Sequence, residues 1–387
     1  MTGLIDSDTS VDAARVWSHR ASRRSTWVMV EVQADGVRGV GELSDGAPPG
    51  TLLTAARSVH SAVVGRSLQQ ARTELRRRLG AMRAAQDAFL WSTVLGGYEA
   101  AFADLLARLE GRALSASLGL GEPRPVRLYA NLNRTFGADG PDTIVAEALR
   151  AAGDGYRAVK VAPFLDNHAA GLSGSRLIAE GLSLVGRVRD VLPRDVHLMV
   201  DCHHLVPADL LPAVVRELAP LGLYWVEDLV PVGDRSAIER AAAAGLPLAT
   251  GEHIWSPETA AAACADGAFR YWLVDPKHAG GPPGVARIAE AVAGTQLTFH
   301  NPSGPVGTAH AAQLAALGGP ATWLELARGE ADRAGLLEPP EAVADGTLRP
   351  AGPGIGGLPH LDPEQEPEQD PSRKGVIRGD HVSVDPR

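Results

Sequence analysis

Three acidic residues end successive apolar runs in the middle of the chain. The run HLMVD ends at Asp201, LYWVE ends at Glu227 and PLATGE ends at Glu252, so the acids lie 25 or 26 residues apart. Buried carboxylates that lie close together are unfavourable unless a cation binds them. Mg²⁺ prefers oxygen ligands and keeps positions open for water or substrate, so these three acids predict a Mg²⁺ site.

The same interval continues on both sides of the three acids. Downstream runs end at Asp275 and His300 or carry Glu325, and upstream runs carry Lys160 or end at Asn131. This set could remove a proton next to a carboxylate, because a metal ion and a lysine would stabilise the negative charge that develops on the oxygens. The histidine titrates near neutral pH and could be the base, with the aspartate holding its second ring nitrogen.

Two further residues could serve this chemistry. His203 follows Asp201 by two residues, so it leaves the strand on the same side as that acid and could protonate a leaving hydroxyl group. Lys277 follows Asp275 and could face the mouth of the site. Taken singly, each of these residues has an ordinary alternative, such as a helix cap, an ion pair or a structural hydrogen bond.

Eight short apolar runs carry these residues, and alanine-rich segments with a helical pattern lie between the runs. Strands that are buried on both faces appear in a sequence as continuous apolar runs. Eight strand–helix units of about 25 residues each are typical of a TIM-type barrel, whose active site lies at the C-terminal ends of the strands. The polar residues fall at those ends.

The residues outside these units predict a second domain and a tail. TWVMVEVQADGVRGVGEL indicates a hairpin that turns at Asp35-Gly36, and residues 51 to 118 have helical periodicity. The last residues are polar and proline-rich, which is typical of disorder. The expected domains are a capping domain (1–125), the barrel with the metal site (126–330), a return to the capping domain (331–362) and a disordered tail (363–387).

The composition excludes several classes of protein. The net charge of −9 argues against non-specific binding to nucleic acid, and no apolar run is long enough to span a membrane. Two cysteines are too few for a disulfide framework, and the first residues lack the features of a signal peptide. We therefore expect a cytoplasmic protein without a nucleic-acid or membrane partner.

The segment SHRASRRST, before the hairpin, is rich in basic residues. One interpretation is a solvated basic loop. The other is a lid in which Arg20 and Arg23 bind the far end of an anionic substrate, since arginine recognises such groups through two parallel hydrogen bonds. The sequence leaves both interpretations open.

The motifs AVKVAPF, LMVDCHH, YWVED, ATGEH, VDPKHAGG, FHNPSGPVGTAH and WLEL together resemble the enolase superfamily, and within it the mandelate racemase-like acid-sugar dehydratases. The resemblance covers nearly the whole chain. It implies an α/β fold, a (β/α)7β barrel with an α+β capping domain formed by the N-terminal segment and the C-terminal return, and a homo-oligomer. It also implies roles for individual residues: a Mg²⁺ ion on Asp201, Glu227 and Glu252, a His300–Asp275 dyad, Glu325 as the acid of the eighth strand, and substrate contacts by Asn131, Asn133 and Lys277.

One motif departs from the family. Members with a base on the second barrel strand have Lys-x-Lys, whereas this chain has Lys160-Val161-Ala162, which disfavours a two-base racemisation. Asp201 and His203 resemble the galactonate dehydratase pattern, in which the histidine is the general acid. The prediction is a Mg²⁺-dependent lyase that converts a hydroxy-carboxylate into a 2-keto-3-deoxy acid, with sugar acids as the favoured substrates. The alternatives are a racemase, epimerase or cycloisomerase that uses the same enolate, and a non-catalytic binding protein on the same fold.

Overall fold

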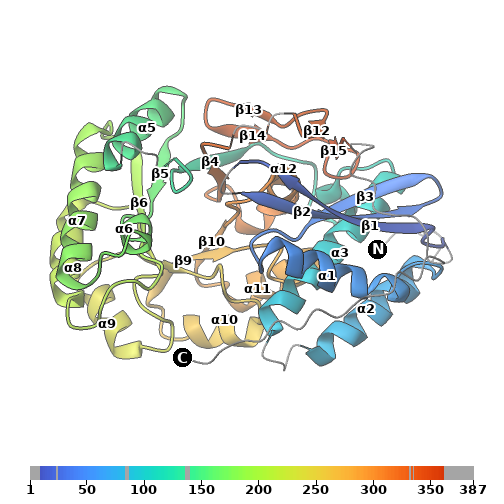
Figure 1. Ribbon diagram of the computed structural model, residues 1–387, viewed down its shortest axis with the longest axis horizontal. Coiled ribbons are helices and arrows are strands. Elements are labelled where there is room, and N and C mark those ends of the chain that lie inside the picture. Colours follow the sequence, from blue (N-terminus) through green and yellow to red (C-terminus); the bar gives the residue numbers. More distant parts are fainter. Residues whose placement is uncertain are drawn as a thin grey trace, which may run out of the picture.

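Eight parallel strands close into a barrel (Figure 1). The structure is a computed structural model that describes residues 9–22, 25–82, 87–135, 140–330, 333 and 335–360. The barrel strands are β4 (Val126–Asn131), β5 (Ala158–Val161), β6 (His197–Asp201), β7 (Trp225–Glu227), β8 (Leu248–Thr250), β9 (Phe269–Val274), β10 (Gln296–Phe299) and β11 (Trp323–Ala327). They pair in sequence order, and β11 pairs with β4 to close the ring, which confirms the predicted barrel.

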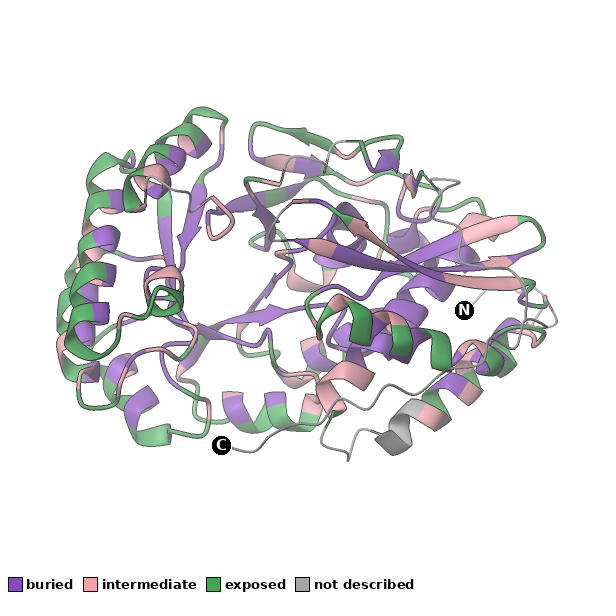
Figure 2. Cartoon of the chain, viewed as in Figure 1, coloured by how far each residue is buried: buried purple, intermediate pink, exposed green. Residues whose placement is uncertain are grey.

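Helices follow the first seven barrel strands, and all of them except the short helix Leu165–Ala169 bury side chains in the protein interior (Figure 2). They are α5 (Pro141–Gly153), α6 (Leu165–Ala169), α7 (Gly174–Val191), α8 (Leu211–Leu218), α9 (Arg235–Ala243), α10 (Pro257–Cys264), α11 (Gly281–Ala291) and α12 (Pro305–Leu314). In the described part of the chain β11 leads to strands and not to a helix, so the barrel has the (β/α)7β arrangement. None of the helices among the described residues is both long and apolar enough to cross a lipid bilayer.

The interior of the barrel has an apolar layer below a polar one. Side chains two residues apart on a strand point to the same side. The apolar layer is one buried cluster of Tyr129, Ala158, Met199, Trp225, Ala249, Tyr271, Leu273 and Trp323. Two residues further along their strands come Asn131, Lys160, Asp201, Glu227, Asp275 and Glu325. The strand alternation therefore directs these polar groups into the C-terminal end of the barrel.

The N-terminal segment forms the capping domain. Its sheet has three antiparallel strands, β1 (Ala13–Arg20), β2 (Thr26–Ala34) and β3 (Val37–Glu42). Asp35 and Gly36 form the two-residue turn between β2 and β3, both with positive φ, as a tight hairpin requires. The helices of this segment are α1 (Pro49–Ser58), α2 (Leu68–Met82), α3 (Ala88–Leu109) and α4 (Leu114–Ser117).

Helix α3 lies directly against the loop that follows β9. A Cβ atom at Gly96 would lie 1.9 Å from the carbonyl oxygen of Lys277 and 3.1 Å from the nitrogen of Gly281. Only glycine allows this approach, because any side chain there would overlap the backbone of the barrel loop. The capping domain and the barrel therefore share a closely packed boundary next to Asp275.

A second contact joins the capping domain to the loop after β10. The buried carboxylate of Glu42, at the end of β3, accepts hydrogen bonds of 2.7 Å from the backbone N–H groups of Gly304 and Gly307. These groups lie at the start of α12, where helix N–H groups have no partner within the helix. A carboxylate is stabilised at such a helix N-terminus.

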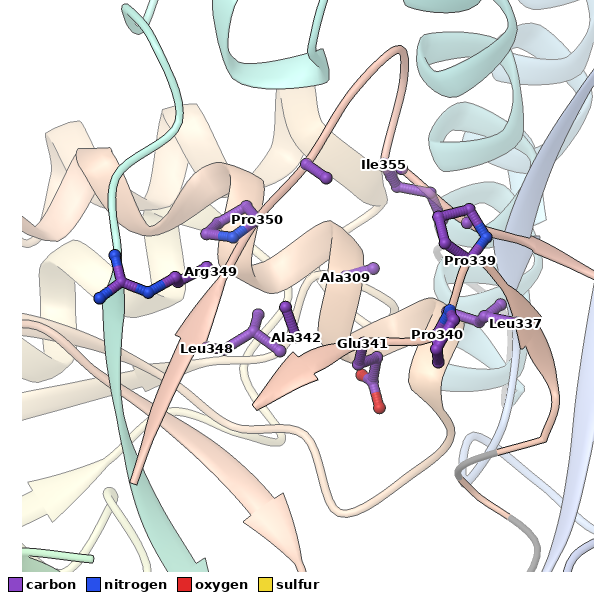
Figure 3. Close-up of a pocket in the computed structure, with 13 residues that line it drawn as sticks. Ala309, Leu337, Pro339, Pro340, Glu341, Ala342, Leu348, Arg349, Pro350 and Ile355 are labelled. Atoms are coloured by element: carbon purple, nitrogen blue, oxygen red, sulfur yellow. The ribbon is translucent and has the colours of Figure 1, made fainter. Parts of the chain in front are cut away.

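The C-terminal return contacts both domains. Strand β14 (Thr347–Arg349) pairs with β13 (Ala342–Ala344) and with the barrel strand β4, while β12 (Leu337–Glu338) pairs with β15 (Leu358–Pro359). None of these four strands joins the capping sheet, but Leu337 packs in one cluster with apolar residues of that domain. A cavity of about 40 Å³ lies between this return and α12 (Figure 3). Its volume is far below the roughly 300–1,000 Å³ that is usual for ligand sites.

Candidate active site

A cavity of about 540 Å³ opens at the C-terminal ends of the barrel strands, where the sequence predicts the site. Oxygen atoms of Asp201, Glu227 and Glu252 lie within 4.8 Å of one another, and all three side chains are buried. The cavity wall includes seven of the predicted site residues: Asn131, Asn133, Lys160, Asp201, His203, Glu252 and His300.

Lys160 lies among the carboxylates. Its Nζ is 3.0 Å from Glu227, 3.3 Å from Glu325 and 3.5 Å from Asp201, and its side chain is only 1% exposed. Burial acts to lower the pKa of Lys160, but the charges of these acids outweigh it and raise the pKa well above its ordinary value. The lysine is therefore a fixed positive charge at the base of the cavity.

One lysine does not compensate the three predicted metal ligands. Burial, together with the charge of Asp201, raises the pKa of Glu227 well above its ordinary value, and burial also raises the pKa of Asp201. Burial would also raise the pKa of Glu252, but the charge of His300 outweighs it and lowers this pKa well below its ordinary value. The ionised forms of Asp201 and Glu227 therefore remain under-stabilised. A hard divalent cation, which prefers oxygen ligands, fits these three carboxylates. The residues present are therefore consistent with the predicted metal site.

We expect Mg²⁺ to stabilise the folded protein against unfolding. A ligand that binds only the folded state adds about 2.7 kcal/mol at one hundred times its Kd. The measurement is thermal unfolding with Mg²⁺ and with a chelator, compared with the Glu227→Gln variant, which should lose most of the rise in Tm. An equal rise in both proteins would place the cation elsewhere.

His300 and Asp275 form the predicted pair. Nδ1 of His300 is 2.9 Å from Oδ2 of Asp275, while Nε2 is 2.8 Å from Glu252 and 3.7 Å from Glu325. Burial alone would lower the pKa of His300, but the charges of the two glutamates outweigh it and raise the pKa well above its ordinary value. A cation bound to Glu252 would offset part of that negative charge, which would favour the neutral ring that a base needs.

Lys277 takes a different position from the one expected. Its ammonium group donates hydrogen bonds of 2.8 Å to Asp275 and to Asn301, and it is not part of the described cavity wall. Burial would raise the pKa of Asp275, but the positive charges of its neighbours, Lys277 among them, lower it. Lys277 thus helps His278 and His300 to keep the aspartate ionised, and its predicted contact with substrate stays a prediction.

Glu325 is held by several donors. Tyr129 donates a hydrogen bond of 3.1 Å to its Oε2, the backbone N–H of Asn301 donates another of 3.1 Å, and the amide of Asn131 donates to Oε1. Burial would raise the pKa of Glu325, yet the charges of Lys160 and His300 lower it. Glu325 is therefore an ionised, firmly oriented acid beneath the cavity.

His203 lies in the cavity wall as the sequence predicts. Its Nδ1 is 3.2 Å from Oδ1 of Asp201, and its side chain is 24% exposed. The backbone of His203 has a φ of +46°, which is uncommon for a residue other than glycine. This angle turns the chain sharply after β6. Of the two arginines expected at the far end, Arg20 is exposed at the end of β1 and outside the described wall, and Arg23 lies outside the described residues.

The structure adds eight residues to the cavity wall that the sequence did not single out for a role. Five of them have charged or titratable side chains, namely Asp45, Arg134, Asp166, His253 and His278, and the others are Leu165, Ala169 and Pro302. The two histidines each follow a predicted site residue closely, in ATGEH and VDPKHAGG, and this proximity was the available signal. Arg134 follows Asn133 directly and could have been found in the same way. Asp45 belongs to the capping domain, in a Ser-Asp-Gly turn that carries no sign of a site.

Comparison with known proteins agrees with this geometry. Residues 143–360 match the family described as Enolase C-terminal domain-like. A D-galactonate dehydratase of Variovorax paradoxus (strain S110) is 24% identical over 304 residues, which cover 78% of this chain and 77% of that protein. A D-gluconate dehydratase of Thermoproteus tenax is 27% identical over 234 residues, which cover 58% of this chain but only 46% of that protein.

Solved structures share the fold across both domains. A member of the enolase superfamily from Salmonella Typhimurium superposes with a TM-score of 0.80 at 20% identity, covering 91% of this chain and 96% of that one. A mandelate racemase/muconate lactonizing enzyme-like protein from Rubrobacter xylanophilus DSM 9941 gives 0.79 at 22% identity, with the same coverage. The chain belongs to the enolase superfamily, and its barrel is the C-terminal domain of the mandelate racemase and muconate lactonizing enzyme type.

Proposed function

We propose that this protein is a Mg²⁺-dependent dehydratase that acts on a hydroxy-carboxylate, with sugar acids as the favoured class. One observation carries the proposal: Glu252 of the carboxylate cluster and the dyad histidine His300 line the same cavity. The relatives named above are galactonate and gluconate dehydratases, which supports a sugar acid as the substrate.

The base of the cavity would bind the carboxylate of the substrate. Mg²⁺ held by Asp201, Glu227 and Glu252 would supply positive charge to the oxygens of that carboxylate. Lys160 adds a permanent charge on the same side, so the extra negative charge of an enolate is stabilised more than the substrate itself. Asn131 and Asn133 lie in the wall, where they can orient the substrate hydroxyl groups.

Two histidines divide the proton transfers. Nε2 of His300 takes the proton from the α-carbon, because Nδ1 is engaged by Asp275. His203 donates a proton to the β-hydroxyl group as the carbon–oxygen bond breaks, and water leaves. The resulting enol gains a proton at the third carbon and loses the proton of its hydroxyl group at the second carbon, which gives a 2-keto-3-deoxy acid with atoms and charge in balance.

The test is proton NMR in D₂O with the full chain, Mg²⁺ and pooled sugar and hydroxy acids. Loss of an α-proton signal together with new signals of a 3-deoxy methylene group is the expected result and identifies the substrate. Exchange of the α-proton without a new skeleton would replace the dehydratase with a racemase or epimerase. No reaction with any acid, in the presence of bound Mg²⁺, would contradict the proposal and favour a binding protein.

A further inference from the structure

Part of the cavity wall comes from loops beyond the strand ends, and these loops carry a charge cluster of their own. Arg134 follows β4, Asp45 follows β3 of the capping domain, and Glu330 follows β11. We name these three residues the distal cluster. Arg134 and Asp45 line the cavity together with Asn133, whereas Glu330 lies behind the arginine.

The arginine of the distal cluster already has two acidic partners. Its Nη2 is 3.6 Å from Oδ1 of Asp45, and its Nε is 3.8 Å from Oε1 of Glu330. The glutamate side chain is only 1% exposed, so its charge is shielded little by water. One guanidinium group against two carboxylates leaves this end of the cavity negatively charged among the described residues.

Acceptor atoms in this region lack donors. Oε2 of Glu330 and Oδ1 of Asn133 are buried, and neither has a hydrogen-bond partner among the described residues. A substrate hydroxyl group in the cavity can donate to Asp45 or Asn133 and can accept from Arg134, whereas a carboxylate can only accept.

We propose that the distal cluster selects substrates whose far end is neutral and hydroxylated, and that it excludes diacids and acids phosphorylated at that end. The inference rests on the proposed function, because that function assigns the single substrate carboxylate to Lys160 and the metal site. A second anionic group would lie beside the carboxylate of Asp45 and would compete with Asp45 and Glu330 for the charge of Arg134. An anionic far end bound by Arg20 and Arg23 would give the opposite preference.

The experiment compares six-carbon monoacids with the diacids of the same stereochemistry, using the full chain with Mg²⁺. We expect kcat/KM for the best monoacid to exceed that for its matched diacid by about tenfold or more, since a like-charge contact near a protein surface is worth at least a tenfold change. Asp45→Asn should reduce this ratio by about tenfold, and Glu330→Gln should change it in the same direction. Asp209→Asn removes an exposed acid before α8 and should leave the ratio unchanged.

The outcomes separate this inference from the proposed function. Turnover of diacids as fast as monoacids, or an unchanged ratio in both acid-to-amide variants, would overturn the inference while the dehydratase function stands. Binding provides a readout that does not need turnover: Mg²⁺-loaded His300→Asn should show a larger rise in Tm with monoacids than with diacids. Equal or stronger binding of diacids, or no binding of either class, would also overturn it.

Discussion

The His300→Asn variant should lose proton abstraction while keeping its fold and its metal. Asparagine can keep a hydrogen bond to Asp275, but it cannot accept a proton near neutral pH. A positioned general base contributes about 10²–10⁴-fold to a rate, so we expect kcat to fall by a factor in that range. Exchange of the substrate α-proton in D₂O should fall together with dehydration, since both depend on the same proton transfer.

The control is His360→Asn. His360 is 60% exposed, its described ion-pair partner is Glu338, and neither residue is part of the described cavity wall, so kcat should be unchanged. The Mg²⁺-dependent rise in Tm should persist in both variants. If His300→Asn still exchanged the α-proton at the wild-type rate, another residue would be the base.

The Lys160→Met variant should lose both activity and stability. The lysine is fully buried among Glu227, Glu325 and Asp201, and its removal leaves these charges uncompensated. Breaking a buried ion pair by removing one partner costs about 3–5 kcal/mol. We expect a loss of this size in the free energy of unfolding, measured with urea at pH 7 in the absence of Mg²⁺.

The loss of stability in Lys160→Met should depend on pH in a defined direction. Burial and the charge of Asp201 already raise the pKa of Glu227 above 4.5, and loss of the lysine would raise it further. An acid whose pKa is raised in the folded state binds its proton more tightly there than in the unfolded chain. The free energy of unfolding therefore increases as the pH falls from the raised pKa of the folded state towards the pKa of the acid in the unfolded chain. The deficit of Lys160→Met should therefore shrink from pH 7 to pH 5, and it should also shrink when Mg²⁺ is added.

The comparison variant is Arg157→Met, which breaks the exposed ion pair with Asp195. Pairs of this kind contribute roughly 0–1 kcal/mol, so its stability should differ little from the wild type at either pH. If Lys160→Met behaved like Arg157→Met, then the buried acids would not depend on the lysine for their charge balance.

The barrel and the base of its cavity could be predicted because both follow from one repeating rule. Six of the eight barrel strands carry an apolar inward residue that is followed, two positions later, by a polar one, as in Trp225 followed by Glu227 or Trp323 followed by Glu325. The interval between strands then brings those second positions to one end of a closed sheet. Local pattern and global geometry agree at these positions, so sequence alone was sufficient.

Contacts between loops could not be predicted in this way. The ion pair between Arg134 and Asp45 joins two loops from different domains, and no periodicity relates them. Lys277 has the residue type of a substrate contact, but its ammonium group turns towards Asp275 and Asn301 because these buried acceptors need a donor. The return segment likewise divides between the barrel edge and the capping domain, a choice that depends on which strand edge is free.

The contact at Gly96 limits how this enzyme can be recombined with its relatives. Helix α3 touches the backbone of the loop from Lys277 to Gly281 with no space for a methyl group. A chimera that takes its N-terminal half from another protein would therefore need a glycine at the position of Gly96. Its loop at Lys277 to Gly281 would also need the same backbone conformation as in this chain. The same transplant would replace Asp45 and so remove the described partner that Arg134 has in the capping domain. The two halves of the chain are thus coupled through these contacts, and neither half can be replaced as an independent module.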